Sequence, residues 1–286
     1  MLMPQVIREI FEKELKEYFD VEDVIVVNSG TSALIATIMS MDLNPESEII
    51  TTPFTFISTS NSILLGNGKP VFVDIKADSK LIDENLIESQ INENTKAIIP
   101  VHLYGRVCNM KKILEIAEKY NLVVIEDTSQ AFGARPDFAS KTSNPKQVSM
   151  GGDQLAGTFG DIGTFSFYKT KNFSTFEGGM ITINKGSKLD GEKIRAITNQ
   201  GQIGRYNHEY LGFNFRLAEP LCLIGLENLK IHKEGFLAEL GLRDETKGHY
   251  PEVVYNQPIY KKLGINGDCP VAEKEALYIK NNFYES

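Results

Sequence analysis

Apolar and polar positions recur along the chain with two alternating periods. In residues 4–19, apolar side chains recur at helical spacing with charged residues between them, a pattern that predicts an amphipathic helix lying on a core. Residues 23–27 are a β-branched run, which a turn around Gly30 breaks before a second predicted helix at 32–41. A strand, a glycine turn and a helix form the opening unit of a parallel α/β fold.

The same alternation continues through the middle of the chain. The run at 122–125 (LVVI) is wholly apolar, as expected for a central strand that is covered on both faces. It ends in Glu126 and Asp127, whose side chains point to opposite sides. The pattern therefore predicts an α/β fold with a mostly parallel sheet, built from strands at 48–52, 70–73, 97–101, 122–125, 164–168 and 180–184 and from helices at 56–65 and 110–120.

Two regions depart from this pattern. Residues 135–157 are rich in Ser, Gly, Asn, Lys and Pro and show no periodicity, which predicts a long mobile loop. After His232 the alternation loosens. With 286 residues, the chain is long enough for one large α/β domain and a smaller appendage. We therefore predict a large domain at 1–232 and a small, partly irregular domain at 233–286.

Composition excludes several classes of protein. Lys plus Arg total 30 and Asp plus Glu total 38, and the net charge of -8 argues against a surface that coats nucleic acid. No apolar stretch approaches the roughly 20 residues of a membrane-spanning helix, and no basic leader precedes an apolar block. Cys108, Cys222 and Cys269 are far apart and form no CxxC pair. We expect a cytoplasmic protein without a metal site or disulfides and without a nucleic-acid or membrane partner.

The turn Asn28-Ser29-Gly30-Thr31-Ser32 is the first candidate for chemistry. A glycine turn at the start of a helix exposes backbone N–H groups and the positive end of the helix dipole beside two hydroxyls, which suits one phosphate. Simple capping of the helix by Ser or Thr explains the same residues. Taken alone, the turn favours capping.

Three further candidates follow predicted strands. Asp127 comes where open α/β sheets place their ligands; its carboxylate either keeps a heterocyclic nitrogen protonated, as in pyridoxal phosphate enzymes, or caps the next turn. Lys169 and Lys171 compete for one inward position, where a lysine in an apolar pocket forms a Schiff base. Most lysines are instead solvated. Phe56 offers an aromatic face to a planar cofactor or belongs to the core.

Together these segments resemble the DegT/DnrJ/EryC1/StrS family of pyridoxal phosphate-dependent sugar aminotransferases. Their order and spacing match the family pattern over roughly the first 230 residues, far beyond what chance turns produce. The matching segments are NSGTSAL (28–34), TPFTFIST (52–59), PVFVDI (70–75), IIPVHLYG (98–105), VVIEDTSQAFGA (123–134), GDIGTFSFYKTKNFSTFEGGMITIN (160–184) and HEYLGFNFRL (208–217).

The resemblance implies a role for individual residues around a pyridoxal 5′-phosphate cofactor. Lys171, in the TKN match, is the expected catalytic lysine: it binds the cofactor covalently and later moves a proton. Asp127 is expected at the pyridine nitrogen, Gln130 beside the oxygen of the ring, and Phe56 stacked on the ring. The implied architecture is the aspartate-aminotransferase fold, fold type I of the pyridoxal phosphate enzymes.

The resemblance also implies which residues bind the phosphate of the cofactor. By resemblance, Gly30, Thr31 and Ser166 hold it, with Ser32 close by. Asn214, in the GFNFR match, is expected to reach the phosphate from the partner subunit, which implies an obligate homodimer with a shared active site.

The implied reaction moves an amino group from an amino acid, usually glutamate, to a nucleotide-linked keto sugar. His208 is expected near the sugar. Some relatives carry histidine in place of the lysine and dehydrate sugars, so Lys171 favours transamination. The alternatives are other chemistry on the same cofactor and a non-catalytic sensor that retains it. The chain departs from the family in a longer 135–157 loop and in a shortened C-terminal small domain, which closes the substrate pocket in relatives.

Overall fold

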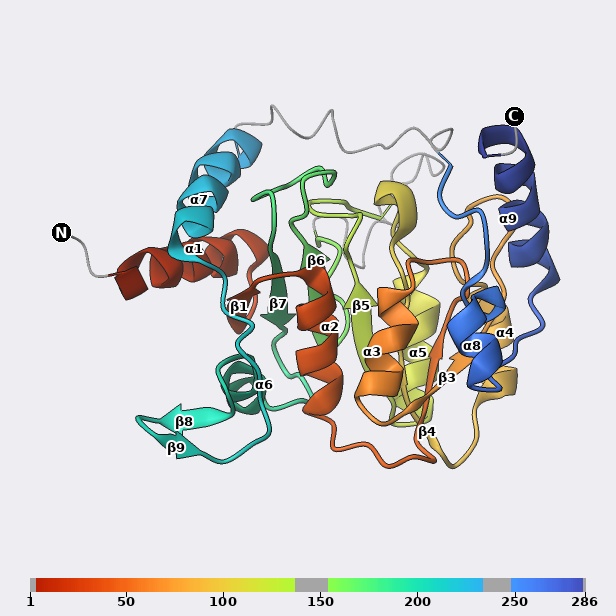
Figure 1. The fold of residues 1–286 in the computed structure, drawn as a ribbon, viewed down its shortest axis with the longest axis horizontal. Helices are drawn as coiled ribbons and strands as arrows, with labels where there is room; N and C mark the ends of the chain where they lie inside the picture. Colours follow the sequence, from red (N-terminus) through yellow and green to blue (C-terminus); the bar gives the residue numbers. More distant parts are fainter. Residues whose placement is uncertain (1–3, 137–153, 234–247, 285–286) are drawn as a thin grey trace, which may run out of the picture.

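The computed structural model describes residues 4–136, 154–233 and 248–284. Helices and strands alternate through most of this length (Figure 1). The strands are β1 (Asp23–Val27), β2 (Glu48–Thr51), β3 (Lys69–Phe72), β4 (Thr95–Ile98), β5 (Val123–Asp127), β6 (Ile162–Ser166), β7 (Gly179–Ile183), β8 (Gln202–Gly204) and β9 (Asn207–His208). The helices are α1 (Pro4–Phe19), α2 (Gly30–Met39), α3 (Ser58–Leu65), α4 (Glu84–Ile87), α5 (Met110–Lys119), α6 (Gly191–Thr198), α7 (Glu219–Lys233), α8 (Pro258–Lys262) and α9 (Pro270–Phe283), with 3₁₀ turns η1 (Glu88–Gln90), η2 (Leu103–Gly105) and η6 (Val254–Asn256).

Within the described residues, seven strands form one sheet in the order β1-β7-β6-β5-β4-β2-β3. Neighbouring strands pair in parallel except at β7, which runs antiparallel to both β1 and β6. The prediction of an α/β fold with a mostly parallel sheet is therefore confirmed. The short β8 and β9 form a separate hairpin that projects from the body of the molecule (Figure 1).

Helices cover both faces of the sheet, and the alternation of strand side chains divides the core between them. On one face, isoleucines such as Ile25 and Ile125 pack against α2, α3 and α6. On the other face, Val24 and Phe165 pack against α1 and α7, while Ile50 and Val124 pack against α5. Each central strand is buried on both faces, which explains why these strands read as continuous apolar runs in the sequence.

The predicted elements and the observed ones differ mainly at their ends. The helix at 4–19 has the predicted bounds. The strand predicted at 164–168 is instead β6, which ends at Ser166. After Ser166 the chain turns: Phe167 N donates to Gly178 O, so residues 167–178 form a link between antiparallel β6 and β7. Helices α6, α7 and α9 were not predicted, because their apolar stripes are short or interrupted.

The C-terminal segment 248–284 joins the core of the large domain. Cys269 and Ala272 belong to the same apolar cluster as Ile50 and Phe54. Asp74, just beyond β3, accepts hydrogen bonds from Val271 N and Ala272 N and so caps α9 (both 2.9 Å). The proposed division at 232/233 stays a prediction, since residues 234–247 lie outside the described residues.

The predicted 135–157 loop is described only at its two ends, because residues 137–153 lie outside the described part. At its end, Leu155 and Ala156 are buried, and Leu155 packs in the same apolar cluster as Phe165 of β6. None of the helices in the described residues is long and apolar enough to cross a membrane.

Candidate active site

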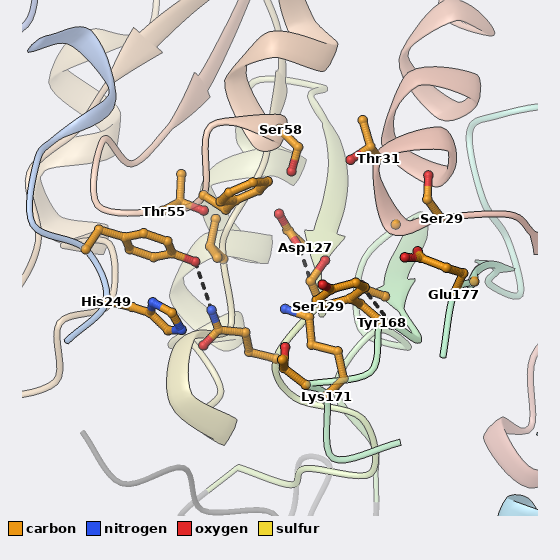
Figure 2. Close-up of a pocket in the computed structure, with 18 of the residues that line it drawn as sticks. Ser29, Thr31, Thr55, Ser58, Asp127, Ser129, Tyr168, Lys171, Glu177 and His249 are labelled. Carbon is orange, nitrogen blue, oxygen red and sulfur yellow. Dashed lines mark hydrogen bonds between the residues drawn. The ribbon is translucent and has the colours of Figure 1, made fainter. Parts of the chain in front are cut away.

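A cavity of about 600 Å³ opens where the parallel strands end and α2 begins. Open α/β sheets bind their ligands at this position, because loops from several strands and helix N-termini converge there. The wall combines the α2 turn, the residues before α3, the end of β5, the link between β6 and β7, and the C-terminal segment (Figure 2). It is lined by Ser29, Gly30, Thr31, Thr55, Phe56, Ser58, Val101, Asp127, Ser129, Gln130, Ser166, Tyr168, Thr170, Lys171, Glu177, Gly178, His249, Tyr250, Pro251 and Tyr284.

The α2 turn forms a cradle for an anion. Ser29 caps the helix and accepts a hydrogen bond from Ser32 N (3.1 Å), while Gly30 and Thr31 begin the helix and face the cavity. A Cβ on Gly30 would lie 2.8 Å from Cβ of Ser166, closer than packed carbons allow. Glycine therefore lets the helix N-terminus approach the end of β6, so that Ser166 and the turn border the same space.

Ser32 stabilises this turn from behind. Its hydroxyl donates to Asn28 Oδ1 (2.6 Å) and lies 2.9 Å from Ser29 Oγ. Because the one proton of Ser32 goes to Asn28, the Ser29 hydroxyl donates to Ser32. Ser32 is buried and does not line the cavity. Ser32, predicted to lie close to a phosphate, is thus one layer behind the turn that borders the cavity.

Asp127 is the last residue of β5 and lines the cavity at 3% exposure. Its Oδ2 accepts a hydrogen bond from the Thr59 hydroxyl (2.8 Å), and its Oδ1 accepts one from Ser129 N (3.1 Å). Both oxygens are therefore held in place, and the carboxylate keeps acceptor capacity toward the cavity.

Glu126 points to the opposite face of β5. Its Oε1 accepts hydrogen bonds from Phe159 N and Gly160 N (both 2.7 Å), and its Oε2 accepts from Gly157 N (2.9 Å) and contacts His102 Nε2 (2.8 Å). Cys108 N donates to His102 Nδ1 (3.2 Å), so Nε2 carries the proton and donates to Glu126. The fully buried Glu126 fastens the chain around 157–160 to the sheet.

Gln130 lines the cavity beside Asp127, and its amide is oriented by two partners. Tyr104 N donates to Oε1 (3.2 Å), and Nε2 donates to the Tyr250 hydroxyl (2.9 Å). The second hydrogen on Nε2 is available for a further acceptor. Through Tyr250, Gln130 also ties the C-terminal segment to the cavity wall.

Of the two competing lysines, Lys171 lines the cavity and Lys169 does not. Lys171 N donates to Tyr168 O (2.8 Å), which forms a tight turn after β6, and the Lys171 side chain extends into the pocket bordered by Asp127 (Figure 2). Lys169 points elsewhere, with Nζ 5.8 Å from the centre of the Tyr168 ring. The turn thus separates two lysines that the local residue pattern left open, and the one in the cavity wall is the lysine that the TKN match implies.

Phe56, the predicted stacking residue, lines the cavity and is 58% exposed. It precedes α3, whereas Phe54 two residues earlier is fully buried. The alternative that Phe56 belongs to the core is therefore wrong, because its ring packs into none of the apolar clusters.

Besides Ser32, two predicted residues do not line the cavity in this chain. His208 lies on the exposed β9, where its Nδ1 is 2.9 Å from Gln200 O. Asn214 is exposed, and its carbonyl oxygen accepts a weak hydrogen bond from Asn28 Nδ2 (3.4 Å). Asn214 is thus next to the cradle turn, and its expected role in a partner's site stays a prediction.

Several lining residues were missed by sequence reasoning. Glu177 lies near Ser29 and Thr31 (Figure 2), and its position before a double glycine was the available signal. His249, Tyr250 and Tyr284 belong to the C-terminal segment, which shows no clear periodicity. Only folding brings that segment to the end of β5.

The arrangement fits a planar phosphorylated cofactor with a basic ring nitrogen and an aldehyde. The Gly30 cradle suits a phosphate, because backbone N–H groups and the helix dipole both favour an anion. The buried Asp127 suits a protonated ring nitrogen, and the Lys171 amine is placed to reach an aldehyde. Phe56 adds an apolar face.

Comparison with known proteins identifies the protein family. Residues 7–239 match the model of the DegT/DnrJ/EryC1/StrS aminotransferase family. The chain is 40% identical over 283 residues to the dTDP-4-amino-4,6-dideoxy-D-glucose transaminase of Shigella dysenteriae, covering 94% of this chain and 72% of that enzyme. It is 36% identical over 244 residues to the GDP-perosamine synthase of Caulobacter vibrioides, covering 85% of this chain but only 60% of that enzyme.

Solved structures agree on the fold. The crystal structure of DesV from S. venezuelae superposes with a TM-score of 0.80 at 26% sequence identity, covering 94% of this chain and 81% of that one. Thus the fold predicted from the resemblance, that of the fold type I enzymes, is confirmed.

Proposed function

Because this chain belongs to the DegT/DnrJ/EryC1/StrS aminotransferase family, we propose that it binds pyridoxal 5′-phosphate through Lys171 and aminates a nucleotide-linked keto sugar. Glutamate is the proposed amino donor. One observation carries the proposal: a single cavity is lined by the Gly30 turn, by Asp127 and by Lys171, residues that lie on three separate segments of the sequence. Taken singly, the Gly30 turn could be a helix cap, Asp127 a cap of the next turn and Lys171 a solvated surface lysine. None of these roles requires the three to lie in one cavity.

When bound, pyridoxal 5′-phosphate supplies an aldehyde and an electron-withdrawing ring that stabilises negative charge on the reacting carbon. Gly30, Thr31 and Ser166 would hold its phosphate, with Ser32 supporting the turn from behind. Asp127 would keep the ring nitrogen protonated, because Thr59 and Ser129 hold its carboxylate in place. Gln130 would donate its second amide hydrogen to the oxygen of the ring, and Phe56 would cover one ring face.

Lys171 has two tasks in this proposal. Its Nζ would hold the cofactor covalently through the aldehyde. The same amine, when not bonded to the cofactor, would serve as the general base and acid for the proton on the donor's Cα. Its backbone turn to Tyr168 holds it at the cavity wall throughout. A lysine at this position, rather than histidine, supports transamination over sugar dehydration.

The acceptor class is inferred from the relatives. The two named above are called a transaminase of a dTDP-linked sugar and a GDP-perosamine synthase. A nucleotide-linked sugar carries a diphosphate, and the cofactor adds a phosphate. Among the described residues that line the cavity, Lys171 is the one lysine or arginine. Because this wall supplies little positive charge, we infer that further groups for the diphosphate come from outside it.

A second copy of the chain is the proposed source. Asn214 is exposed beside the cradle turn, and His208 is exposed on the projecting β8–β9 hairpin (Figure 1). We infer a homodimer in which Asn214 of one chain reaches the phosphate in the other and His208 lies near the sugar.

The cofactor proposal is tested by borohydride trapping. Protein incubated with pyridoxal 5′-phosphate should show a visible absorption band, and reduction should fix the cofactor on the tryptic peptide that contains Lys171, as mass spectrometry will detect. Lys171→Ala should abolish the adduct, whereas the control Lys169→Ala should retain it. The reverse result would assign the wrong lysine, and no band with added cofactor would end the proposal.

The reaction is tested with glutamate and a panel of nucleotide-linked keto sugars, with product mass as the readout. A band that changes with glutamate and a product that gains an amino group support transamination. Loss of water from the sugar without amination supports dehydration. A band indifferent to every amino donor supports a sensor that retains its cofactor.

The shared site is tested by mixing inactive subunits. Lys171→Ala and Asn214→Ala homodimers should each have little activity. A mixed dimer should recover part of the wild-type activity, because one of its sites contains both native residues. Failure of the mixture to recover activity, with exchange of subunits demonstrated, would contradict a site shared between subunits.

A further inference from the structure

A chain of two threonine hydroxyls leads into the Asp127 carboxylate. Thr59 Oγ1 lies 2.8 Å from Asp127 Oδ2, and Thr55 Oγ1 lies 2.9 Å from Thr59 Oγ1. Thr59 is fully buried, and Thr55 and Asp127 are each 3% exposed. Hydrogen bonds to an ionised group in such surroundings are stronger than exposed ones, because little water competes for them.

The direction of these two hydrogen bonds follows from counting protons. An ionised carboxylate accepts hydrogen bonds but donates none, so the Thr59 hydroxyl must donate to Asp127. A hydroxyl has one proton, so Thr59 Oγ1 must accept the hydrogen bond that joins it to Thr55. The donors therefore point from Thr55 to Thr59 and from Thr59 to Asp127.

The Thr59 hydroxyl has no role in capping α3. The helix begins at Ser58 with no side-chain cap, and Thr59 contributes its backbone N–H separately, to Phe56 O (3.2 Å). A comparison within the chain is Thr51, which is also fully buried but donates its hydroxyl to a backbone carbonyl, Ile99 O (2.9 Å). The hydroxyl of Thr51 thus donates a hydrogen bond within the sheet, whereas the hydroxyl of Thr59 donates one to a carboxylate that lines the cavity.

We propose that Thr59 is a positioning residue for the cofactor: it orients Asp127 and stabilises its negative charge, so that the carboxylate holds the ring nitrogen in its protonated form. Ser129 N fixes the other carboxylate oxygen, so the plane of the carboxylate is set by two donors from different segments. Thr55 strengthens the effect, because a hydroxyl that accepts a hydrogen bond becomes a better donor. The inference rests on the proposed function, since it requires that pyridoxal 5′-phosphate occupies the cavity.

The test compares Thr59→Val with Thr51→Val. Each change replaces a buried hydroxyl by a methyl of similar size, but only Thr59→Val removes a donor from Asp127. With pyridoxal 5′-phosphate labelled by ¹⁵N in the ring, the ring-nitrogen resonance should move toward the unprotonated position in Thr59→Val. The Kd of the cofactor and the rate of the glutamate half-reaction should each worsen by roughly ten-fold. Thr51→Val should keep the wild-type resonance, and Thr59→Ser should restore it.

The outcomes separate the two proposals. If the wild-type protein forms no Lys171 adduct with the cofactor, the proposed function itself fails. If the wild type forms the adduct but Thr59→Val and Thr51→Val show the same resonance and cofactor affinity, Thr59 is only a structural residue and the inference is overturned. Should Thr59→Val not fold, Thr55→Val provides the measurement: a smaller shift in the same direction is expected, and an unchanged resonance overturns the inference.

Discussion

Glu126 and Asp127 are adjacent on β5, but the two carboxylates serve different regions of the molecule. Glu126 faces the side covered by α1, α5 and α7. There, three backbone N–H groups and His102 donate hydrogen bonds to its carboxylate oxygens. Asp127 faces the side of α2 and α3, where two donors hold it and the cavity receives the rest of its acceptor capacity. The pleat of one strand thus separates a carboxylate that stabilises the fold from one that is available to a ligand.

The comparison teaches how to recognise a functional acid among buried ones. Both side chains are almost completely buried, so burial does not distinguish them. The saturation of their hydrogen bonds does: Glu126 has four donors, and Asp127 has two beside a cavity. Four predictions test this difference, from the largest expected effect to the smallest.

Lys171→Ala should have the largest effect. If the Asp127 side is the reactive one, removing the amine that extends into the same cavity should lower kcat of the transamination by about 10⁴-fold or more, because covalent binding and proton transfer are both lost. The Tm should change little, since Lys171 is partly exposed. Activity within ten-fold of the wild type would contradict the assignment of this side of β5 as the active site.

Glu126→Gln should chiefly destabilise the fold. An amide offers one acceptor oxygen and two donor hydrogens, so it cannot accept four hydrogen bonds, and at least one donor around residues 157–160 would face another donor. We expect the free energy of unfolding to fall by about 3–5 kcal/mol, because several buried donors lose a charged acceptor at once and each unsatisfied donor costs about 1–3 kcal/mol. Urea denaturation measures it, and a loss below about 1 kcal/mol would show that Glu126 is not the anchor described here.

Asp127→Asn makes the same chemical change one residue later and should affect catalysis instead. The amide can still accept from Ser129 N, but it has no negative charge for the ring nitrogen. We expect kcat/KM to fall by about 10²–10³-fold, comparable to removing a preorganised electrostatic contact. Denaturation should show a smaller loss than for Glu126→Gln. If the two amide variants lose stability equally, the contrast between the two carboxylates is wrong.

Phe56→Ala should have the smallest effect. Phe56 is 58% exposed, so its truncation costs little core packing. Loss of the aromatic face should raise the Kd of pyridoxal 5′-phosphate by about three- to ten-fold, in line with the energy of an aromatic pair. Equilibrium titration of the visible band measures this. Phe54→Ala is the matched control: that ring is fully buried in the core, and its truncation should lower Tm strongly.

Sequence reasoning anticipated the order of the strands along the chain and most of the cofactor side of the cavity. The alternating pattern is visible in the sequence because central parallel strands are apolar on both faces. It placed Gly30, Asp127 and Phe56 at strand ends and turns, where the structure has them. It missed α6, α7 and α9, whose buried stripes are short or contain Gly, Ala or His in place of larger apolar residues. It also missed His249 and Tyr250, which reach the cavity from a distant segment.

The amino-acid sequence by itself determined the α/β class, the family and the types of group available for chemistry, because these depend on local periodicity and on motifs of fixed spacing. The family resemblance implied Lys171 and Asp127, but only the tertiary structure brings both to one cavity and leaves Lys169 and Glu126 outside its lining. It also decided that Thr59, from a segment far from β5 in sequence, donates to Asp127. The physical reason is that contacts and hydrogen bonds between segments distant in the sequence form only when strands and turns are packed together, and no local pattern encodes them.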